Sequence, residues 1–270
     1  MDQKLTEAQL DAYLARIGIA RPEQADIAAL KAIHQGHALG FTWEAIDCFM
    51  GWPSSLAPQA IFTKMVEERR GGWCYEMNGL LGAALSACGF AVTRLCGGVR
   101  RADMGDLAIG NHLTLRIDFE EPWLAEAGLG DALVDPVPLV IGPIAQNGYD
   151  FAIEPADGDW LRFHNHAYGG APTFDFRPDH TDEAALAGAQ RWLMENDASP
   201  FRANLVIQRH FPDRIESLVN ATWRTISPQG VVERPVGDFS AFASLLENVF
   251  QIDPPRCEAI WSRVNENSGT

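Results

Sequence analysis

Apolar side chains recur at helical spacing along the first part of the chain. An apolar stripe predicts a helix over Glu7–Ile17, with Thr6 as its cap. Pro22 opens a second predicted helix, and Gly40 closes it. Short elements are predicted at Trp43–Met50 and Pro58–Glu68, and a longer helix is predicted over Cys74–Cys88. The amino-terminal third of the chain is therefore expected to be helical.

After Gly89 the apolar period shortens from about 3.6 residues to about 2, which is the period of a strand. This period predicts strands at Phe90–Arg100, His112–Phe119, Trp123–Glu126, Asp150–Glu154, Trp160–His164, Asn204–Gln208 and Ile215–Trp223. Helices are predicted at Asp182–Glu195, Asp238–Phe250 and Pro255–Val264. This order of helices, then mostly strands, then helices favours an α+β fold over a strictly alternating parallel sheet.

The composition is that of a soluble globular protein, with 47% hydrophobic and 21% charged residues in a chain of 270. The formal net charge of −15 argues against a nucleic-acid partner, because phosphate binding needs a concentrated basic surface. The apolar runs are far shorter than the roughly 20 residues of a membrane span. The amino-terminal segment has no secretory signal pattern, so we expect a cytoplasmic protein without a membrane partner.

The cysteines do not form a disulfide or zinc pattern. Their number is odd and no C-x-x-C occurs, so we interpret them as individual thiols. The five residues are Cys48, Cys74, Cys88, Cys96 and Cys257. His34 and His37 have a spacing compatible with metal binding, but no carboxylate or third histidine lies nearby in sequence. We interpret these two histidines as solvated or packed helix residues, and we expect no metal.

Cys74 differs from the other cysteines in its position. It follows a glycine turn and begins a predicted helix, where the positive end of the helix dipole should lower the pKa of the thiol. A thiolate is the nucleophilic form, and it needs a base and a group that orients the base. His112 begins one predicted strand and Glu126 ends the next, so antiparallel pairing would bring them together. The alternative is a buried structural cysteine, and spacing alone does not decide between the two.

The segment Arg70–Asn78, RGGWCYEMN, resembles the R-G-G-x-C-[FY]-E-x-N signature of the arylamine N-acetyltransferase family. Further similar motifs follow in the family's order, and the resemblance covers nearly the whole chain. These motifs are Gly89–Val92, Val99-Arg100, Asn111–Leu113, Trp123–Gly130, Ser199–Leu205 and a carboxyl-terminal helix with Trp261.

The resemblance implies a fold with a cysteine-protease-like catalytic core. A helical bundle (residues 1–89) would carry the nucleophile, and a β-barrel-like domain (residues 90–200) would carry the histidine and the acid. An α/β lid (residues 201–270) would complete the fold.

The resemblance also implies a ping-pong reaction. Cys74 would take an acetyl group from acetyl-CoA, release CoA, and pass the acetyl group to an arylamine, arylhydrazine or N-hydroxyarylamine. His112 and Glu126 would complete the catalytic triad. Residues expected to contact co-substrate or acceptor are Arg70, Trp73, Gly128 and Leu129. The resemblance implies no metal, and it is compatible with a homodimer.

Three departures from the family pattern affect the expected site. Glu126 stands where the family has aspartate, so its carboxylate reaches one methylene further. The alternatives are that Asp131 or solvent takes this role, or that the site has lost activity. Phe41–Ala45 replaces the common P-F-E-N, and Leu129 replaces a common phenylalanine, so the choice of acceptor is open.

Other functions are compatible with the same residues. One is a cysteine amide synthase or acyltransferase with a donor other than acetyl-CoA. A second is a cysteine hydrolase with the same triad. A third is a catalytically weakened protein that only binds ligand.

Overall fold

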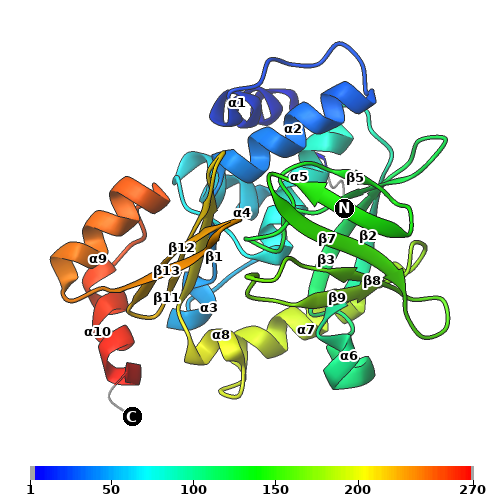
Figure 1. Cartoon of the computed structure of the whole chain (residues 1–270). Helices are drawn as coiled ribbons and strands as arrows, with labels where there is room; N and C mark the ends of the chain where they lie inside the picture. The colour runs from blue at the N-terminus through cyan, green and yellow to red at the C-terminus, as the bar shows by residue number, and fades with distance from the viewer. Residues whose placement is uncertain (1–3, 269–270) are drawn as a thin grey trace.

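The computed structural model describes residues 4–268, and its first part is a group of helices (Figure 1). The helices of this part are α1 (Glu7–Ile17), α2 (Ile27–Gly40), α3 (Ile46–Met50), α4 (Pro58–Phe62) with a π-helical continuation (Thr63–Glu67), and α5 (Cys74–Ala87). Thr6 caps α1 as predicted. The predicted start of α2 at Pro22 is wrong. The helix begins after Asp26, whose carboxylate accepts from the Ala29 N–H at 2.8 Å and caps it.

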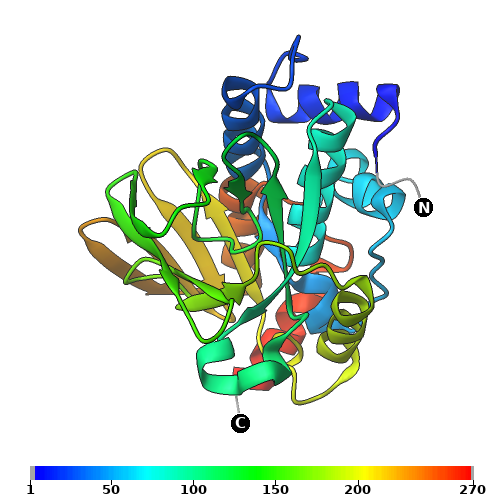
Figure 2. The same ribbon diagram turned by 90° about the vertical axis from the view of Figure 1, so that its right-hand side faces the viewer.

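An eight-stranded antiparallel sheet follows and curls into a barrel-like shape (Figures 1 and 2). Its strands lie in the order β5-β4-β3-β2-β9-β8-β7-β6. Their bounds are β2 (Val92–Val99), β3 (His112–Ile117), β4 (Trp123–Ala125), β5 (Val137–Pro138), β6 (Gly142–Gln146), β7 (Tyr149–Pro155), β8 (Leu161–His164) and β9 (Thr173–Phe176).

A five-stranded antiparallel sheet forms most of the last part of the chain. Its strands, in spatial order, are β1 (Trp43–Glu44), β10 (Val206–His210), β11 (Ile215–Val219), β12 (Thr222–Ser227) and β13 (Gly230–Pro235). The single strand predicted over Ile215–Trp223 is wrong, because the chain reverses there. Asn220 has a φ of 53° and makes a tight turn between β11 and β12, a conformation that asparagine tolerates better than most residues.

Shorter helices connect and cover the sheets. They are α6 (Arg101–Met104) with a 3₁₀ turn (Gly105–Ala108), α7 (Glu183–Glu195), α8 (Pro200–Ala203), α9 (Phe239–Leu245) with a π-helical continuation (Leu246–Phe250), and α10 (Cys257–Ser268). The predicted helix before the second sheet is confirmed as α7, with Asp182 as its cap. No helix within residues 4–268 has the length and apolar character that a bilayer crossing requires.

Helix α5 occupies the centre of the molecule. It contacts α1 and α2 on one side and β2 and β3 on the other (Figure 2). Every residue from Cys74 to Leu85 is buried, which explains why this helix is apolar around most of its circumference. The predicted α+β fold, with its helical first part and barrel-like sheet, is confirmed. The start of α5 thereby lies at the junction of the helices and the larger sheet.

Candidate active site

The turn that precedes Cys74 has no room for a side chain at Gly71 or at Gly72. A Cβ atom on Gly71 would lie 2.2 Å from the carbonyl oxygen of Thr42, and one on Gly72 would lie 2.7 Å from a side chain of α5. The Gly72 N–H donates to the Thr42 carbonyl at 3.2 Å, and the Glu44 N–H donates to the Gly72 carbonyl at 3.0 Å. The two glycines therefore let the chain pass against β1 and enter α5.

Cys74 is the first residue of α5 and is only 4% exposed. The preceding residue, Trp73, is the N-cap, and its N–H donates to the carboxylate of Glu76 at 3.2 Å. The Cys74 thiol donates to the carbonyl oxygen of Asn111, with 3.8 Å between Sγ and O. Since Asn111 directly precedes His112, the thiol lies against the beginning of β3.

The register of β3 and β4 brings His112 and Glu126 together. Leu115 pairs with Ala125, so Glu126 follows on at the level of Thr114. His112 lies two residues before Thr114 and therefore on the same face of the strand. Its Nε2 is 3.0 Å from Oε2 of Glu126, and both side chains are buried. The two strand ends meet, as expected from antiparallel pairing of adjacent strands.

The second ring nitrogen of His112 is available to act as a base. Nδ1 is buried and has no hydrogen-bond partner within residues 4–268. The ring of Phe174 packs against the imidazole, with 4.7 Å between centroids. When Nε2–H donates to a carboxylate, Nδ1 of a neutral imidazole carries a lone pair. His112 therefore combines an orienting carboxylate on one nitrogen with a proton acceptor on the other.

The longer side chain of Glu126 is accommodated because it folds back on its own backbone. Its Oε1 accepts from the N–H groups of Gly128 at 2.5 Å and Leu129 at 2.9 Å, while Oε2 faces His112. A Cβ atom on Gly128 would lie 3.0 Å from Oε1 and 3.1 Å from Cε1 of His112, so the turn needs glycine at this position. The extra methylene therefore still permits the contact with His112.

Asn78 is part of this arrangement, although the sequence analysis did not select it. Its Nδ2 donates to both carboxylate oxygens of Glu126, each at 3.2 Å, and to the carbonyl oxygen of Leu113 at 2.6 Å. Its Oδ1 accepts from the Ala127 N–H at 2.9 Å. Asn78 follows Cys74 by four residues and so shares its face of α5, a spacing that could have identified it.

The charges of the site favour an ionised acid. Burial opposes ionisation of Glu126, but the charge of His112 and hydrogen bonds from His112 and Asn78 outweigh it. They hold the pKa of this carboxyl below its ordinary value. A negative charge on Glu126 can therefore stabilise an imidazolium on His112.

The thiol of Cys74 has the opposite electrostatic balance. Burial is the main cause that raises the pKa of Cys74, and the negative charge of Glu126 is the second. Hydrogen bonds from the backbone of Leu113 and Tyr75 lower this pKa, but by less, so the net shift is upward. The lowered pKa predicted from the start of the helix is therefore wrong for the resting thiol, because loss of water outweighs the helix terminus. Such a thiol reacts once a neighbouring base takes its proton.

Asp131, the alternative partner for His112, is bound elsewhere. Its carboxylate accepts from Asn165 Nδ2 at 3.1 Å, from the Gly170 N–H at 2.7 Å and from Gln208 Nε2 at 2.8 Å. These bonds tie the loop after β8 to β10 and engage both carboxylate oxygens. The carboxylate that contacts His112 is that of Glu126.

Arg70 belongs to a buried network of ion pairs. Its guanidinium donates to Glu44 at 2.8 Å and to Asp47 at 2.7 Å. Lys64 continues the network, with Nζ 2.8 Å from Asp47 and 2.8 Å from Glu76. Burial works against the charge of Lys64, but these carboxylates raise its pKa above the ordinary value. The members come from separate elements of the chain, so no local pattern of residues indicates the network.

The remaining predicted contact residues occupy different surroundings. Trp73 packs edge-on against Tyr75 and Phe201, with centroid distances of 4.9 Å and 5.7 Å. The carbonyl of Gly128 accepts from Trp43 Nε1 at 2.7 Å. Leu129 packs into the core of the larger sheet. Gly128 and Leu129 thus lie beside the His112–Glu126 pair, whereas Arg70 is held by Glu44 and Asp47.

No cluster of three or more histidine, cysteine, aspartate or glutamate side chains suited to a metal occurs in the described part of the chain. All five cysteines are free thiols.

The chain is similar to proteins whose sequences or structures are known. Residues 26–256 match the family model described as N-acetyltransferase. The arylamine N-acetyltransferase of Mycolicibacterium smegmatis is 37% identical over 148 residues, or 52% of this chain and 54% of that protein. The chain thus spans about half the length of this relative in the sequence alignment.

Similarity in structure extends further. A solved arylamine N-acetyl transferase of M. smegmatis has a TM-score of 0.85 and 28% identity, and the match covers 95% of this chain and 97% of that one. The structure of Mycobacterium marinum arylamine N-acetyltransferase in complex with CoA has a TM-score of 0.86 and 23% identity, with 95% and 98% covered.

Proposed function

The chain belongs to the arylamine N-acetyltransferase family, and on this premise we propose that it transfers acetyl groups from acetyl-CoA to arylamines and arylhydrazines. N-hydroxyarylamines, which would be acetylated on oxygen, are part of the same proposal. Cys74 is the residue that carries the acetyl group, His112 is the base, and Glu126 orients the base.

One observation carries the assignment. His112 contacts Glu126 through Nε2 at 3.0 Å, and its Nδ1 has no partner within residues 4–268. His112 is the first residue of β3, and the Cys74 thiol lies against this beginning of the strand. Nucleophile, base and orienting carboxylate are the three groups that covalent acyl transfer needs. A buried structural cysteine would need neither a base with an open nitrogen nor an ionised acid behind it.

The first half of the reaction follows from this arrangement. Nδ1 of His112 takes the thiol proton as Sγ of Cys74 attacks the thioester carbonyl carbon of acetyl-CoA. The bond between this carbon and the sulfur of CoA breaks, and the CoA thiolate takes the proton from His112. Glu126 stabilises the transient imidazolium, which lowers the free energy needed to ionise a buried thiol.

The second half regenerates the thiol. The amine nitrogen attacks the acetyl carbon of acetyl-Cys74, and the carbon–sulfur bond breaks as the amide forms. His112 takes the proton that the nitrogen loses and returns it to Sγ. Water is kept from the acyl intermediate because Cys74, His112 and Glu126 are all buried.

The co-substrate and the acceptor are proposed from the relatives. The M. marinum structure is a complex with CoA, which supports acetyl-CoA as the donor. The names of the relatives support an arylamine acceptor. The free thiols fit a reducing compartment, and a cytoplasmic location is part of the proposal.

We also propose three structural units with boundaries near 89/90 and 200/201. Three groups of buried apolar residues support this division, because each is centred on one unit although it includes residues of its neighbours. One surrounds α5 and extends to β3, one lies on the larger sheet and extends to Ile215 and Ile226, and one lies between the smaller sheet and the last helices and extends to α3. β1 pairs with β10, so the first unit lends a strand to the third.

The test is steady-state kinetics with acetyl-CoA and an arylamine. We expect CoA release to require the amine, with parallel double-reciprocal plots, because donor and acceptor react in turn with one thiol. CoA release that proceeds at the same rate without any amine would indicate a hydrolase instead. Absence of release with acetyl-CoA, but turnover of a longer acyl thioester, would indicate a different donor.

A further inference from the structure

A second histidine, outside the triad, contacts the backbone of Glu126. His34 lies on α2 and is completely buried. Its Nε2 accepts from the Glu126 N–H at 3.0 Å, and its Nδ1 is 2.7 Å from the carbonyl oxygen of Val134. One imidazole thus bridges the two ends of the loop 126–134, which carries the triad acid.

The partners of His34 fix its protonation. A backbone N–H can only donate, so Nε2 must be the acceptor and carry a lone pair. A carbonyl can only accept, so Nδ1 must carry the hydrogen. His34 is therefore a neutral imidazole protonated on Nδ1. A second proton would point Nε2–H at the Glu126 N–H and break the bond.

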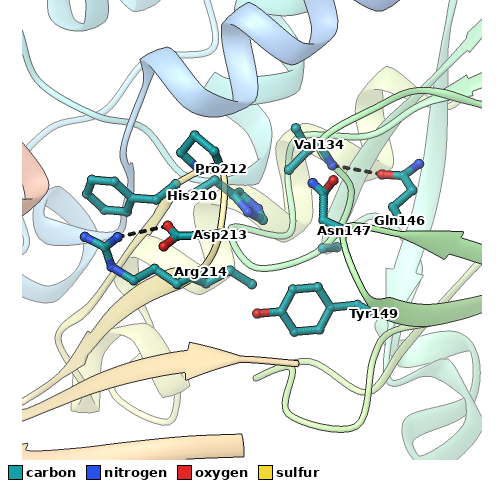
Figure 3. A pocket seen from close by; sticks show the side chains of 11 residues that line it. Val134, Gln146, Asn147, Tyr149, His210, Pro212, Asp213 and Arg214 are labelled. Carbon is teal, nitrogen blue, oxygen red and sulfur yellow. Dashed lines mark hydrogen bonds and ion pairs between the residues drawn. The ribbon is translucent and has the colours of Figure 1, made fainter. Parts of the chain in front are cut away.

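The far end of the bridge is itself anchored. The Val134 and Asp135 N–H groups donate to Oε1 of Gln146, at 3.3 Å and 3.1 Å, and Gln146 Nε2 donates to the Asp135 carbonyl at 2.9 Å. Figure 3 shows Gln146 reaching Val134 from the neighbouring hairpin. His34 therefore connects the Glu126 backbone to helix α2, on which His34 lies, and to Val134, which Gln146 holds in place.

The Glu126 N–H marks where the strand pairing stops. The ladder between β3 and β4 has its last pair at Ala125 and Leu115. The N–H groups after Glu126 are bound by the active-site residues themselves: Ala127 by Asn78, and Gly128 and Leu129 by the Glu126 carboxylate. The path of the chain into this turn therefore depends on the bond to His34.

We propose that His34 is a positioning residue for the triad. It sets the backbone of Glu126 so that the carboxylate meets Nε2 of His112. The inference rests on the proposed function, in which Glu126 orients His112. His34 touches neither the thiol nor a reacting atom, and it acts only through Glu126.

The test compares His34→Leu and His34→Gln with His37→Leu as a matched control. Leucine removes both hydrogen bonds, whereas the glutamine amide offers one donor and one acceptor. His37 is also fully buried on α2, but its Nδ1 is 2.9 Å from Tyr13 OH and it has no bond to the loop 126–134. Both leucine variants lose a buried imidazole, and only one loses the contact with Glu126.

The readout is the rate of Cys74 alkylation against pH, together with the rate of acetyl transfer. In His34→Leu we expect transfer to fall at least about tenfold and the alkylation inflection to shift by about one pH unit, since a displaced Glu126 changes the negative charge that both the Cys74 thiol and the His112 imidazolium experience. His34→Gln should recover most of both. His37→Leu should keep the wild-type inflection even if it is less stable.

A wild-type inflection and rate in His34→Leu, or an equal shift in His37→Leu, would overturn the proposal. If His34→Leu does not fold, the ¹⁵N shifts of His34 in the wild-type protein decide instead. The neutral Nδ1–H tautomer is expected at neutral pH, and the Nε2–H tautomer or a charged ring would refute the bridge. Alkylation needs no acyl donor, so it tests His34 even if the wild-type protein proves not to transfer acetyl groups.

Discussion

The side-chain amide of Asn78 donates to both carboxylate oxygens of Glu126, each at a distance of 3.2 Å. Asn78 is on the same helix as Cys74, so one rigid element holds the nucleophile and also the acid behind its base. Asn78, the last residue of the segment Arg70–Asn78, therefore contacts the triad acid directly. Helix α5 therefore positions both the Cys74 thiol and, through Asn78, the carboxylate of Glu126.

Replacing Asn78 by aspartate should therefore impair the reaction. Asn78→Asp keeps the size of the side chain but places a carboxyl group against the Glu126 carboxylate and removes the donor to the Leu113 carbonyl. We expect acetyl transfer to fall on the order of 100-fold. The matched variant is Asn220→Asp, which changes a partly exposed asparagine in the turn between β11 and β12 and should retain activity. Similar rates in both variants would contradict a role for Asn78.

The charge of Glu126 should matter more than its length. Glu126→Gln keeps the size but loses the negative charge that stabilises the His112 imidazolium, so we expect acetyl transfer to fall about 1,000-fold or more. Glu126→Asp should retain activity within about tenfold, because an aspartate can still accept from the N–H two residues on. Transfer at the wild-type rate in Glu126→Gln would show that no orienting acid is needed.

The buried network around Arg70 should be a source of stability. Lys64→Met leaves the carboxylates of Asp47 and Glu76 without their ammonium partner, and breaking such a pair costs about 3–5 kcal/mol. Arg94→Met removes a more exposed pair with Glu183, which should cost below about 1 kcal/mol. Urea unfolding of both variants measures the difference. Equal losses would show that the buried network contributes no more than a surface pair.

Stability should decrease on mild acidification. Burial, followed by nearby positive charge, lowers the pKa of His37 and of His210 to about 3. The unfolded chain binds these protons near pH 6.5, so between about pH 6.5 and pH 3 the unfolded state gains protons that the folded state does not.

Each of these two histidines should cost about 2 kcal/mol of unfolding free energy at pH 5 relative to pH 7. The raised pKa of Glu76 acts in the opposite sense, so the observed loss should be smaller than the sum. Urea unfolding at pH 7, 6 and 5 gives the slope, and His210→Gln should reduce it. A stability that is flat from pH 7 to pH 5 would contradict neutral buried histidines.

The sequence predicted the elements whose pattern is local. The stripe of α1, the long apolar helix α5 and the alternation in β3 each depend on neighbouring residues, and all three are present. The chain reversal at Asn220 was missed because apolar residues continue through the turn. β1 was missed because two residues become a strand only by pairing with β10, which is far away in sequence.

The parts of the candidate site that depend on local pattern were predicted, and those that depend on contacts between distant parts of the chain were not. The contact of His112 with Glu126 follows from strand order and alternation, and the motif pointed to Cys74. The direction of the Cys74 pKa shift was wrong, since burial depends on the whole fold. The bridge made by His34 also depends on α2 meeting the loop 126–134, for which local periodicity carries no information.

The central claim is that Cys74 carries the acetyl group. Intact-protein mass spectrometry after brief exposure to acetyl-CoA without an amine, followed by peptide mapping, tests it most directly. We expect the mass of one acetyl group on the peptide that contains Cys74, its loss when an arylamine is added, and no added mass in Cys74→Ala. Cys48→Ala, which removes another buried helical thiol, should be acetylated like the wild-type protein. Acetylation that persists in Cys74→Ala, or an acetyl group that an arylamine does not remove, would contradict the mechanism.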